Sequence, residues 1–207
     1  MIKDASIEAF IEALASKSAT PGGGSVTAIM GAMGAALVSM VCNLTIGKKN
    51  YESVSDEMID LLARAGRLEQ RFLDLVRADV DAFDGVMASY GLPKETEEEK
   101  VKRSEAIQNA LKDATRVPLE CVAACVEVVD LADIAAQKGN KNVLSDAGVA
   151  VAAARAALDS AKLNVEVNLG AIRDGIFVAE SRTRLEQMSF GAADKASTVY
   201  RRVLEGL

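Results

Sequence analysis

Three consecutive glycines followed by a long stretch without charge constrain this chain more than any other feature. Residues 20–25 read Thr-Pro-Gly-Gly-Gly-Ser, and no charged side chain occurs over residues 26–46. Glycines in a row cost conformational entropy, so they are typical of a sharp turn or of backbone that approaches another group closely. Ser25 suits the N-cap of a helix that ends near Gly47, with Lys48 and Lys49 at its negative C-terminal end. We interpret the glycine loop, the apolar helix and its basic exit as one candidate site.

Three structures can be compared with this stretch. A phosphate-binding loop would need the spacing G-x-x-x-x-G-K-[ST] after a strand, and the sequence shows neither feature. A membrane span needs roughly 20 apolar residues, and the stretch is long enough, but it includes polar side chains such as Ser39 and Asn43. A helix buried in a bundle fits best, because its alanines and glycines let neighbouring backbones approach closely. We therefore expect no membrane association.

The whole chain predicts an all-α fold, namely a single-domain bundle of long helices over residues 1–207. Half of the residues are hydrophobic, only 4% are aromatic, and proline occurs three times. Apolar residues at helical spacing predict helices near residues 7–14, 25–46, 53–90, 97–117, 118–138, 146–169 and 175–204. Thr96 and Glu99 form a capping box, and Pro118 suits the first turn of a new helix.

The helix predicted over residues 53–90 carries a heptad seam that an acid interrupts. Apolar residues follow a 4-3 spacing from Val54 to Leu75, and the next seam position is Asp79. A carboxylate on a buried seam is costly unless it is paired. Asp79 is either satisfied by an arginine or a hydrogen-bond network, or it is a functional acid.

Two stripes of small and polar residues follow a 3-4 spacing. The first consists of Ser25, Ala28, Ala32, Ala36, Ser39 and Asn43, and the second begins at Asp146. Its members at 3-4 spacing are Asp146, Ala150, Ala153, Ala157, Ser160, Asn164 and Asn168. Asp146 is either the N-cap of its helix or a functional carboxylate. The two asparagines at the far end of the stripe favour a ligand or a polar network there.

The chain contains no histidine. This excludes a Ser-His-Asp triad, a Cys-His pair and an H-E-x-x-H zinc site. Cys42, Cys121 and Cys125 form neither an even disulfide framework nor a C-x-x-C pair, so we expect free, buried thiols. We expect no metal and no cofactor, and acid–base chemistry must then fall to Asp, Glu, Lys, Tyr or water.

Net charge and the N-terminal residues limit the partners and the location. The formal net charge of −6 argues against nucleic acid, which needs a basic face. No basic segment followed by an apolar core precedes Ser6, so the sequence shows no secretory signal. We expect a cytoplasmic protein.

Several of these segments occur together, and in this order, in one known family. They are the glycine loop, the Gly47-Lys48-Lys49 exit, Gly91-Leu92-Pro93-Lys94, and Gly139-Asn140 leading to Ser145-Asp146. Over nearly its whole length the chain resembles the cyclodeaminase/cyclohydrolase family, which includes the C-terminal half of formiminotransferase-cyclodeaminase. Residues 31–49 are most similar to the stand-alone bacterial methenyltetrahydrofolate cyclohydrolases of the serine cycle. The resemblance implies an all-helical homodimer with a folate bound in a cleft near the dimer interface.

One departure from the family pattern separates two activities. In the bifunctional cyclodeaminase, a histidine shortly after the Gly-Lys motif is the proposed proton donor, and the matching position here is Ser53. Release of ammonia needs a protonated leaving amine, whereas hydration of a methenyl bridge needs a proton acceptor. The resemblance therefore implies a hydrolase that interconverts 5,10-methenyltetrahydrofolate and 10-formyltetrahydrofolate. The alternatives are formiminotetrahydrofolate cyclodeaminase and a non-enzymatic helical folate-binding or scaffold module.

The resemblance and the two stripes together imply roles for particular residues. Asp146 is the first candidate for the carboxylate at the methenyl carbon, and Asp79 is the second. Lys48 would polarise the forming oxygen or bind the folate. The remaining residues would bind substrate or shape the wall of the site, namely Gly22, Gly23, Gly24, Ser25, Asn43, Lys49, Tyr51 and Asn164.

Overall fold

The computed structural model describes residues 6–207, and it is helical nearly throughout, with no strand among those residues. The helices are α1 (Ile7–Leu14), α2 (Gly23–Asn43), α3 (Ser55–Tyr90), α4 (Glu97–Lys138), α5 (Leu144–Gly170), α6 (Gly175–Ser189) and α7 (Ala192–Gly206). Two short 3-10 turns, η2 (Glu52–Val54) and η3 (Lys141–Val143), precede α3 and α5. The predicted all-α class is confirmed.

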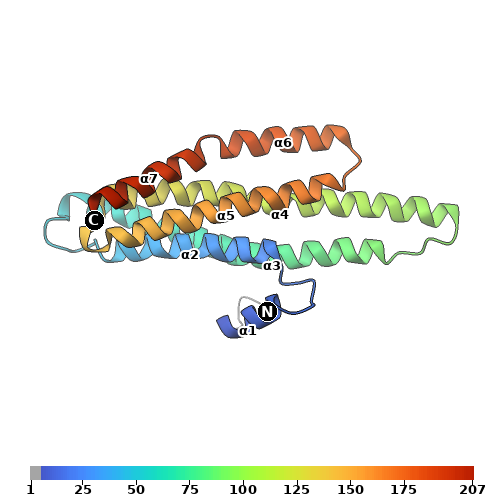
Figure 1. The fold of residues 1–207 in the computed structure, drawn as a ribbon, viewed down its shortest axis with the longest axis horizontal. Helices are drawn as coiled ribbons and strands as arrows, with labels where there is room; N and C mark the ends of the chain where they lie inside the picture. Colours follow the sequence, from blue (N-terminus) through green and yellow to red (C-terminus); the bar gives the residue numbers. More distant parts are fainter. Residues whose placement is uncertain (1–5) are drawn as a thin grey trace.

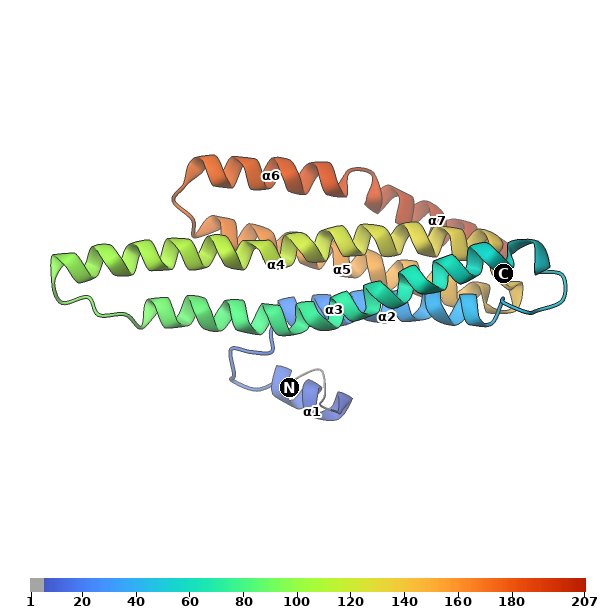
Figure 2. The same cartoon turned by 180° about the vertical axis from the view of Figure 1, so that it is seen from behind.

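Four helices form the body of the molecule. In Figures 1 and 2, α2, α3, α4 and α5 run side by side, and α3 and α4 extend well beyond the N-terminal end of α2. Both views place α1 outside this bundle on the α2 side, while α6 and α7 return along α4 and α5. The N-terminal end of α2 therefore lies part-way along the bundle rather than at its tip.

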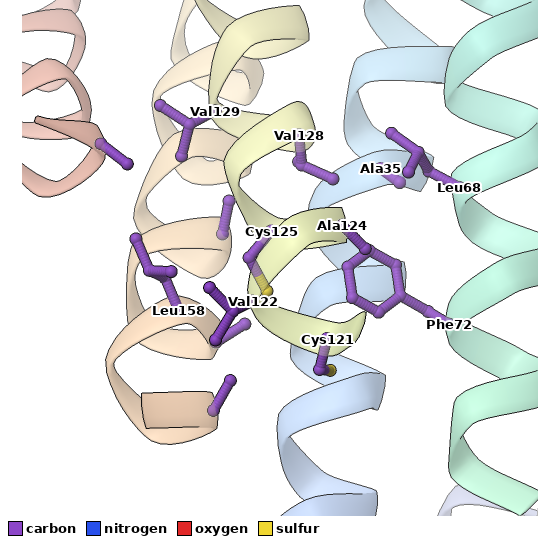
Figure 3. Close-up of a cluster of buried hydrophobic side chains, with 14 of the residues drawn as sticks. Ala35, Leu68, Phe72, Cys121, Val122, Ala124, Cys125, Val128, Val129 and Leu158 are labelled. Carbon is purple, nitrogen blue, oxygen red and sulfur yellow. The ribbon is translucent and has the colours of Figure 1, made fainter. Parts of the chain in front are cut away.

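Side chains at heptad spacing on α3 pack into the core. The seam residues Met58, Leu61, Ala65, Leu68, Phe72 and Leu75 of α3 are all buried. Figure 3 shows Phe72 and Leu68 of α3 on one side of Cys121, Ala124, Cys125 and Val128 of α4, with Leu158 of α5 beyond. The three cysteines are free and buried, as the sequence predicts.

Small residues on α2 allow the close approach that its composition predicts. A Cβ atom at position 31 would lie only 2.3 Å from Cε1 of Phe72, and one at position 34 would lie 3.1 Å from the carbonyl oxygen of Ala150. By length and hydropathy alone, α2 could cross a membrane, but half of its most apolar window is buried against the other helices. The structure thus favours a core helix of the bundle.

The structure corrects several predicted boundaries. Helix α4 continues through Pro118, so the break predicted there is wrong. Ser25 lies inside α2, whose N-cap is Gly22, and Asp146 is the third residue of α5, whose N-cap is Val143. The predicted last helix is divided into α6 and α7 near Gly191, which has a positive φ of 68°.

Candidate active site

The N-terminal end of α2 brings a carboxylate against the glycine loop. Asp79 reaches from α3 to this end, and the Ser25 hydroxyl donates a hydrogen bond to its Oδ2 at 2.9 Å. A Cβ atom at position 24 would lie 1.9 Å from Oδ1 of Asp79, so only glycine leaves room for the carboxylate there. The third glycine of the loop is therefore explained by the acid that packs on it.

Asp79 also lines a small, largely enclosed cavity. Four helices contribute to its wall, which consists of Gly24, Thr27, Ala28, Leu75, Asp79, Val117, Pro118, Cys121 and Asn164. Burial raises the pKa of the Asp79 carboxyl, and hydrogen bonds from Ser25 act in the opposite direction. Ser25 rather than an arginine pairs with this seam acid, and the sequence had left open an arginine or a hydrogen-bond network for that task.

Asn164 connects α5 to the same end of α2. Its Nδ2 donates to Oγ1 of Thr27 at 3.2 Å, and the Thr27 hydroxyl donates to the carbonyl of Gly23 at 2.7 Å. Its Oδ1 lies 3.5 Å from the position that a Cβ of residue 23 would take. The amide thus holds the glycine loop while its oxygen faces the loop.

A side chain replaces the backbone hydrogen bond that the proline in the cavity wall cannot make. Pro118 has no N–H, so the carbonyl of Ala114 loses its helical donor. Nδ2 of Asn168 donates to that carbonyl at 3.1 Å. The second asparagine of the α5 stripe therefore has a structural partner. The sequence singled out Asn168 but did not reveal this partner, because Pro118 was expected to begin a helix.

A second group of predicted residues lies at the C-terminal end of α2. The backbone N–H of Asn140 donates to Oγ1 of Thr45, and that of Lys141 donates to the Tyr51 hydroxyl, at 2.8 and 2.9 Å. The loop after α2 and the turn before α5 are thereby joined. Lys48, Lys49 and Asn43 are exposed beside them, and Asp146 is partly buried.

These two groups are far apart within one chain. A helix of 21 residues such as α2 is about 30 Å long at 1.5 Å per residue. The glycine end holds Gly22, Gly23, Gly24, Ser25, Asp79 and Asn164, while the lysine end holds Asn43, Lys48, Lys49, Tyr51 and Asp146. The sequence interpretation of one continuous site is therefore not met within a single chain.

The sequence reasoning missed two polar residues of the glycine end. Thr27 and Cys121 line the cavity beside Asp79. The sequence predicted only a buried thiol at Cys121. Within residues 6–207, no group of three or more Cys, Asp or Glu side chains is placed to hold a metal ion.

Comparison with known proteins identifies the family. The family model for formiminotransferase-cyclodeaminase matches residues 6–187. The chain is 51% identical over 203 residues to methenyltetrahydrofolate cyclohydrolase of Methylorubrum extorquens, which covers 98% of both chains. It is 35% identical to rat formimidoyltransferase-cyclodeaminase over 95% of this chain but only 36% of the rat protein.

A solved structure has the same fold over the whole chain. The crystal structure of formiminotetrahydrofolate cyclodeaminase from Thermotoga maritima superposes with a TM-score of 0.85 at 32% identity, covering 100% of this chain and 98% of that one. The family match, the relatives and the fold agree with the motifs at both ends of α2. The chain therefore belongs to the formiminotransferase-cyclodeaminase family.

Proposed function

We propose that this protein is a methenyltetrahydrofolate cyclohydrolase of one-carbon metabolism, acting as a single-domain, cytoplasmic homodimer. The observation that carries this proposal is the 51% identity to the Methylorubrum cyclohydrolase over 98% of both chains. Such even coverage fits a shared activity of the whole chain rather than one borrowed segment. The natural substrate is then the cationic 5,10-methenyl form of tetrahydrofolate.

The chemistry of hydration suits the residues of the chain. Water attacks the carbon of the N5–CH–N10 bridge, a carboxylate accepts a proton from the water, and the C–N5 bond then breaks with its electron pair going to N5. The hydroxyl of the adduct loses its proton as the formyl C=O bond forms, and N5 takes up one proton. The products are 10-formyltetrahydrofolate and one released proton. Release of ammonia would need a donor for the leaving amine, and the chain has no histidine for that task.

Asp146 is the first candidate for the proton acceptor. It lies in the first turn of α5, at the positive end of the helix dipole. Lys48 would polarise the forming oxygen or bind the folate, and Lys49 would bind the folate. Asn43 would hydrogen-bond the pterin or water. Tyr51 would contribute to the wall, because its hydroxyl already accepts from Lys141.

The separation of the two groups of residues supports a site that two copies share. Exposed apolar residues run along α2 between its ends, and Met33, Ala36 and Met40 are among them. Together with Ile7 and Ile11 of α1, which are 83% and 55% exposed, they leave a large apolar face uncovered. Antiparallel pairing of two α2 helices around Met33 and Ala36 would bring the glycine end of one copy to the lysine end of the other.

A groove beside this face has the composition of an interface. It has a volume of about 620 Å³, and residues of α1, α2 and α3 line it, among them Phe10, Ile29 and Leu73. Apolar patches of this kind are typical of surfaces that another chain covers. A second copy would thus cover apolar surface and complete the site at once.

Formiminotetrahydrofolate cyclodeaminase is the second candidate function. The full-length superposition on the Thermotoga cyclodeaminase favours it. The 35% identity to 36% of the rat formimidoyltransferase-cyclodeaminase is also consistent with it. A non-enzymatic folate-binding module is the third alternative. Two assays separate the three functions.

The first assay follows the loss of methenyltetrahydrofolate absorbance after addition of the protein. We expect a rate proportional to protein concentration and well above the spontaneous rate. The second assay measures ammonia release from formiminotetrahydrofolate, which we expect to be absent. Ammonia without methenyl hydrolysis would assign the deaminase function, and tight folate binding without either reaction would assign the binding module.

A further inference from the structure

We propose that Asp79 is the carboxylate that recognises the positive charge of the methenyl bridge, and that Ser25 is the residue that positions it. This inference rests on the proposed function, because it uses the charge of that substrate. It assigns to the glycine end of α2 a specificity role that is separate from proton acceptance by Asp146.

The position of Asp79 is fixed from two sides. Ser25 is fully buried and donates to Oδ2, and the absence of a side chain at Gly24 allows the carboxylate to lie against the backbone. A Cβ at position 24 would approach Oδ1, Cγ and Oδ2 of Asp79 within 1.9, 2.4 and 2.7 Å. Gly24 and Ser25 therefore fix the position of this carboxylate.

The surroundings of Asp79 lack a protein cation. Within residues 6–207, none of the Lys and Arg side chains lies within salt-bridge distance of it, and its neighbours in the cavity wall are apolar or neutral. The groups that face it are Ser25 and Thr27 on α2, Asn164 on α5 and the thiol of Cys121 on α4, which is the one other titratable group of that wall. On α3 itself, the nearby Arg77 is paired with Asp81. A partly buried carboxylate without a counter-ion favours a cationic ligand, because such a ligand offsets its lost hydration.

The same geometry also has a purely structural interpretation. The N-cap residue Gly22 has no side chain that could cap α2, and a carboxylate at that end would interact favourably with the positive end of the helix dipole. A capping role predicts only a loss of stability when Asp79 is changed. A charge-recognition role predicts a change in ligand preference and in pH dependence.

The first experiment compares a cationic ligand with a neutral one. In Asp79→Asn, which keeps the shape and can still cap α2, we expect the KM for the methenyl cation to rise by about tenfold or more. The inhibition constant of the neutral product 10-formyltetrahydrofolate should change by less than about threefold. If binding of both ligands were weakened equally, or binding of neither, Asp79 would not be the residue that recognises the positive charge.

The second experiment tests Ser25 through the ionisation of Asp79. A hydrogen bond to the ionised carboxylate lowers its pKa, so Ser25→Ala should raise the pKa of Asp79 further. Activity that needs the ionised form is lost as pH falls through this pKa, so the acid limb of kcat/KM should move to higher pH. The matched control is Thr115→Val, which removes a buried hydroxyl on α4 that donates to Leu111.

Carbon-13 NMR of the Asp79 carboxyl gives a readout that does not depend on turnover. We expect its titration to move in Ser25→Ala and to stay in place in Thr115→Val, although both variants lose some stability. An unchanged titration in Ser25→Ala would overturn the positioning role. If the wild-type protein did not hydrolyse methenyltetrahydrofolate, the proposed function would fall. Direct binding of the cation and of the neutral product to wild type and to Asp79→Asn would then decide the inference separately.

Discussion

Asp146 is not the N-cap of α5, so a capping role and a catalytic role predict different effects of its substitution. The N-cap of α5 is Val143, and its side chain makes no capping hydrogen bond. Asp146 is the third residue of the helix, so its contribution to stability comes from the dipole, which is typically worth about 0.3–1 kcal/mol.

For Asp146→Asn we predict a fall in kcat by a factor of about 10² to 10⁴, which is the usual loss when a general base is removed. The midpoint of thermal unfolding should change little, because only a small dipole interaction is lost. Steady-state kinetics and calorimetry on the same preparation check both expectations. Near-normal turnover in a folded Asn variant would transfer the role of base to Asp79.

Two glycines in helix interiors differ in what surrounds them. Gly31 packs on the buried ring of Phe72, whereas a Cβ at Gly66 would meet nothing within 4 Å. We predict that Gly31→Ala lowers the free energy of unfolding by about 1–3 kcal/mol through overpacking. Gly66→Ala should raise it by about 0.4–1 kcal/mol, because alanine restricts the unfolded chain. Urea denaturation of the pair measures both, and destabilisation by Gly66→Ala would contradict the packing described for α3.

At the scale of elements, α4 shows why a helix boundary read from proline was wrong. Proline in the first turn of a helix costs nothing, and a proline inside a helix leaves a carbonyl without its donor. In α4 this carbonyl belongs to Ala114, and the side chain of Asn168 on α5 donates to it in place of the missing N–H. The two residues are 54 positions apart in the sequence. Local sequence contains no sign of this compensation.

A double-mutant cycle tests the link between α4 and α5. Asn168→Leu should lower stability by about 1–3 kcal/mol, because it leaves the buried Ala114 carbonyl unpaired. In a Pro118→Ala background the restored amide of residue 118 can donate to that carbonyl, so the same change should cost at least about 1 kcal/mol less. Equal costs in both backgrounds would show that the hydrogen bond does not compensate for the proline.

At the scale of the whole molecule, periodic features were predictable and long-range placement was not. The heptad seam of α3 and the capping box at Thr96 follow from local spacing, and the structure confirms both. The hydrogen bond from Ser25 to Asp79 joins residues 54 positions apart, and the two ends of α2 are separated by the length of the helix. The sequence shows polar residues on the stripes, but their assignment to two ends of α2 needed the packing of four helices.

The proposed reaction uses carboxylates and needs no metal ion. The chain has no histidine, and residues 6–207 hold no group of three acidic or thiol side chains placed as metal ligands. We predict that prolonged treatment with EDTA leaves the hydrolysis of methenyltetrahydrofolate intact. A substantial loss that zinc or magnesium restores would contradict the proposed mechanism.

The central claim is a cyclohydrolase site that two copies build together, with Asp79 from one copy and Asp146 from the other. Mixed dimers test it most directly. Asp79→Asn and Asp146→Asn proteins are each assayed alone, then unfolded together in equal amounts, refolded, and assayed by loss of methenyltetrahydrofolate absorbance. Random pairing makes half of the dimers mixed, and each mixed dimer has one intact site. At substrate concentrations well below the wild-type KM, where each variant alone is slow, the account predicts recovery of about a quarter of the wild-type rate. A mixture that is no more active than the mean of its two components would contradict it.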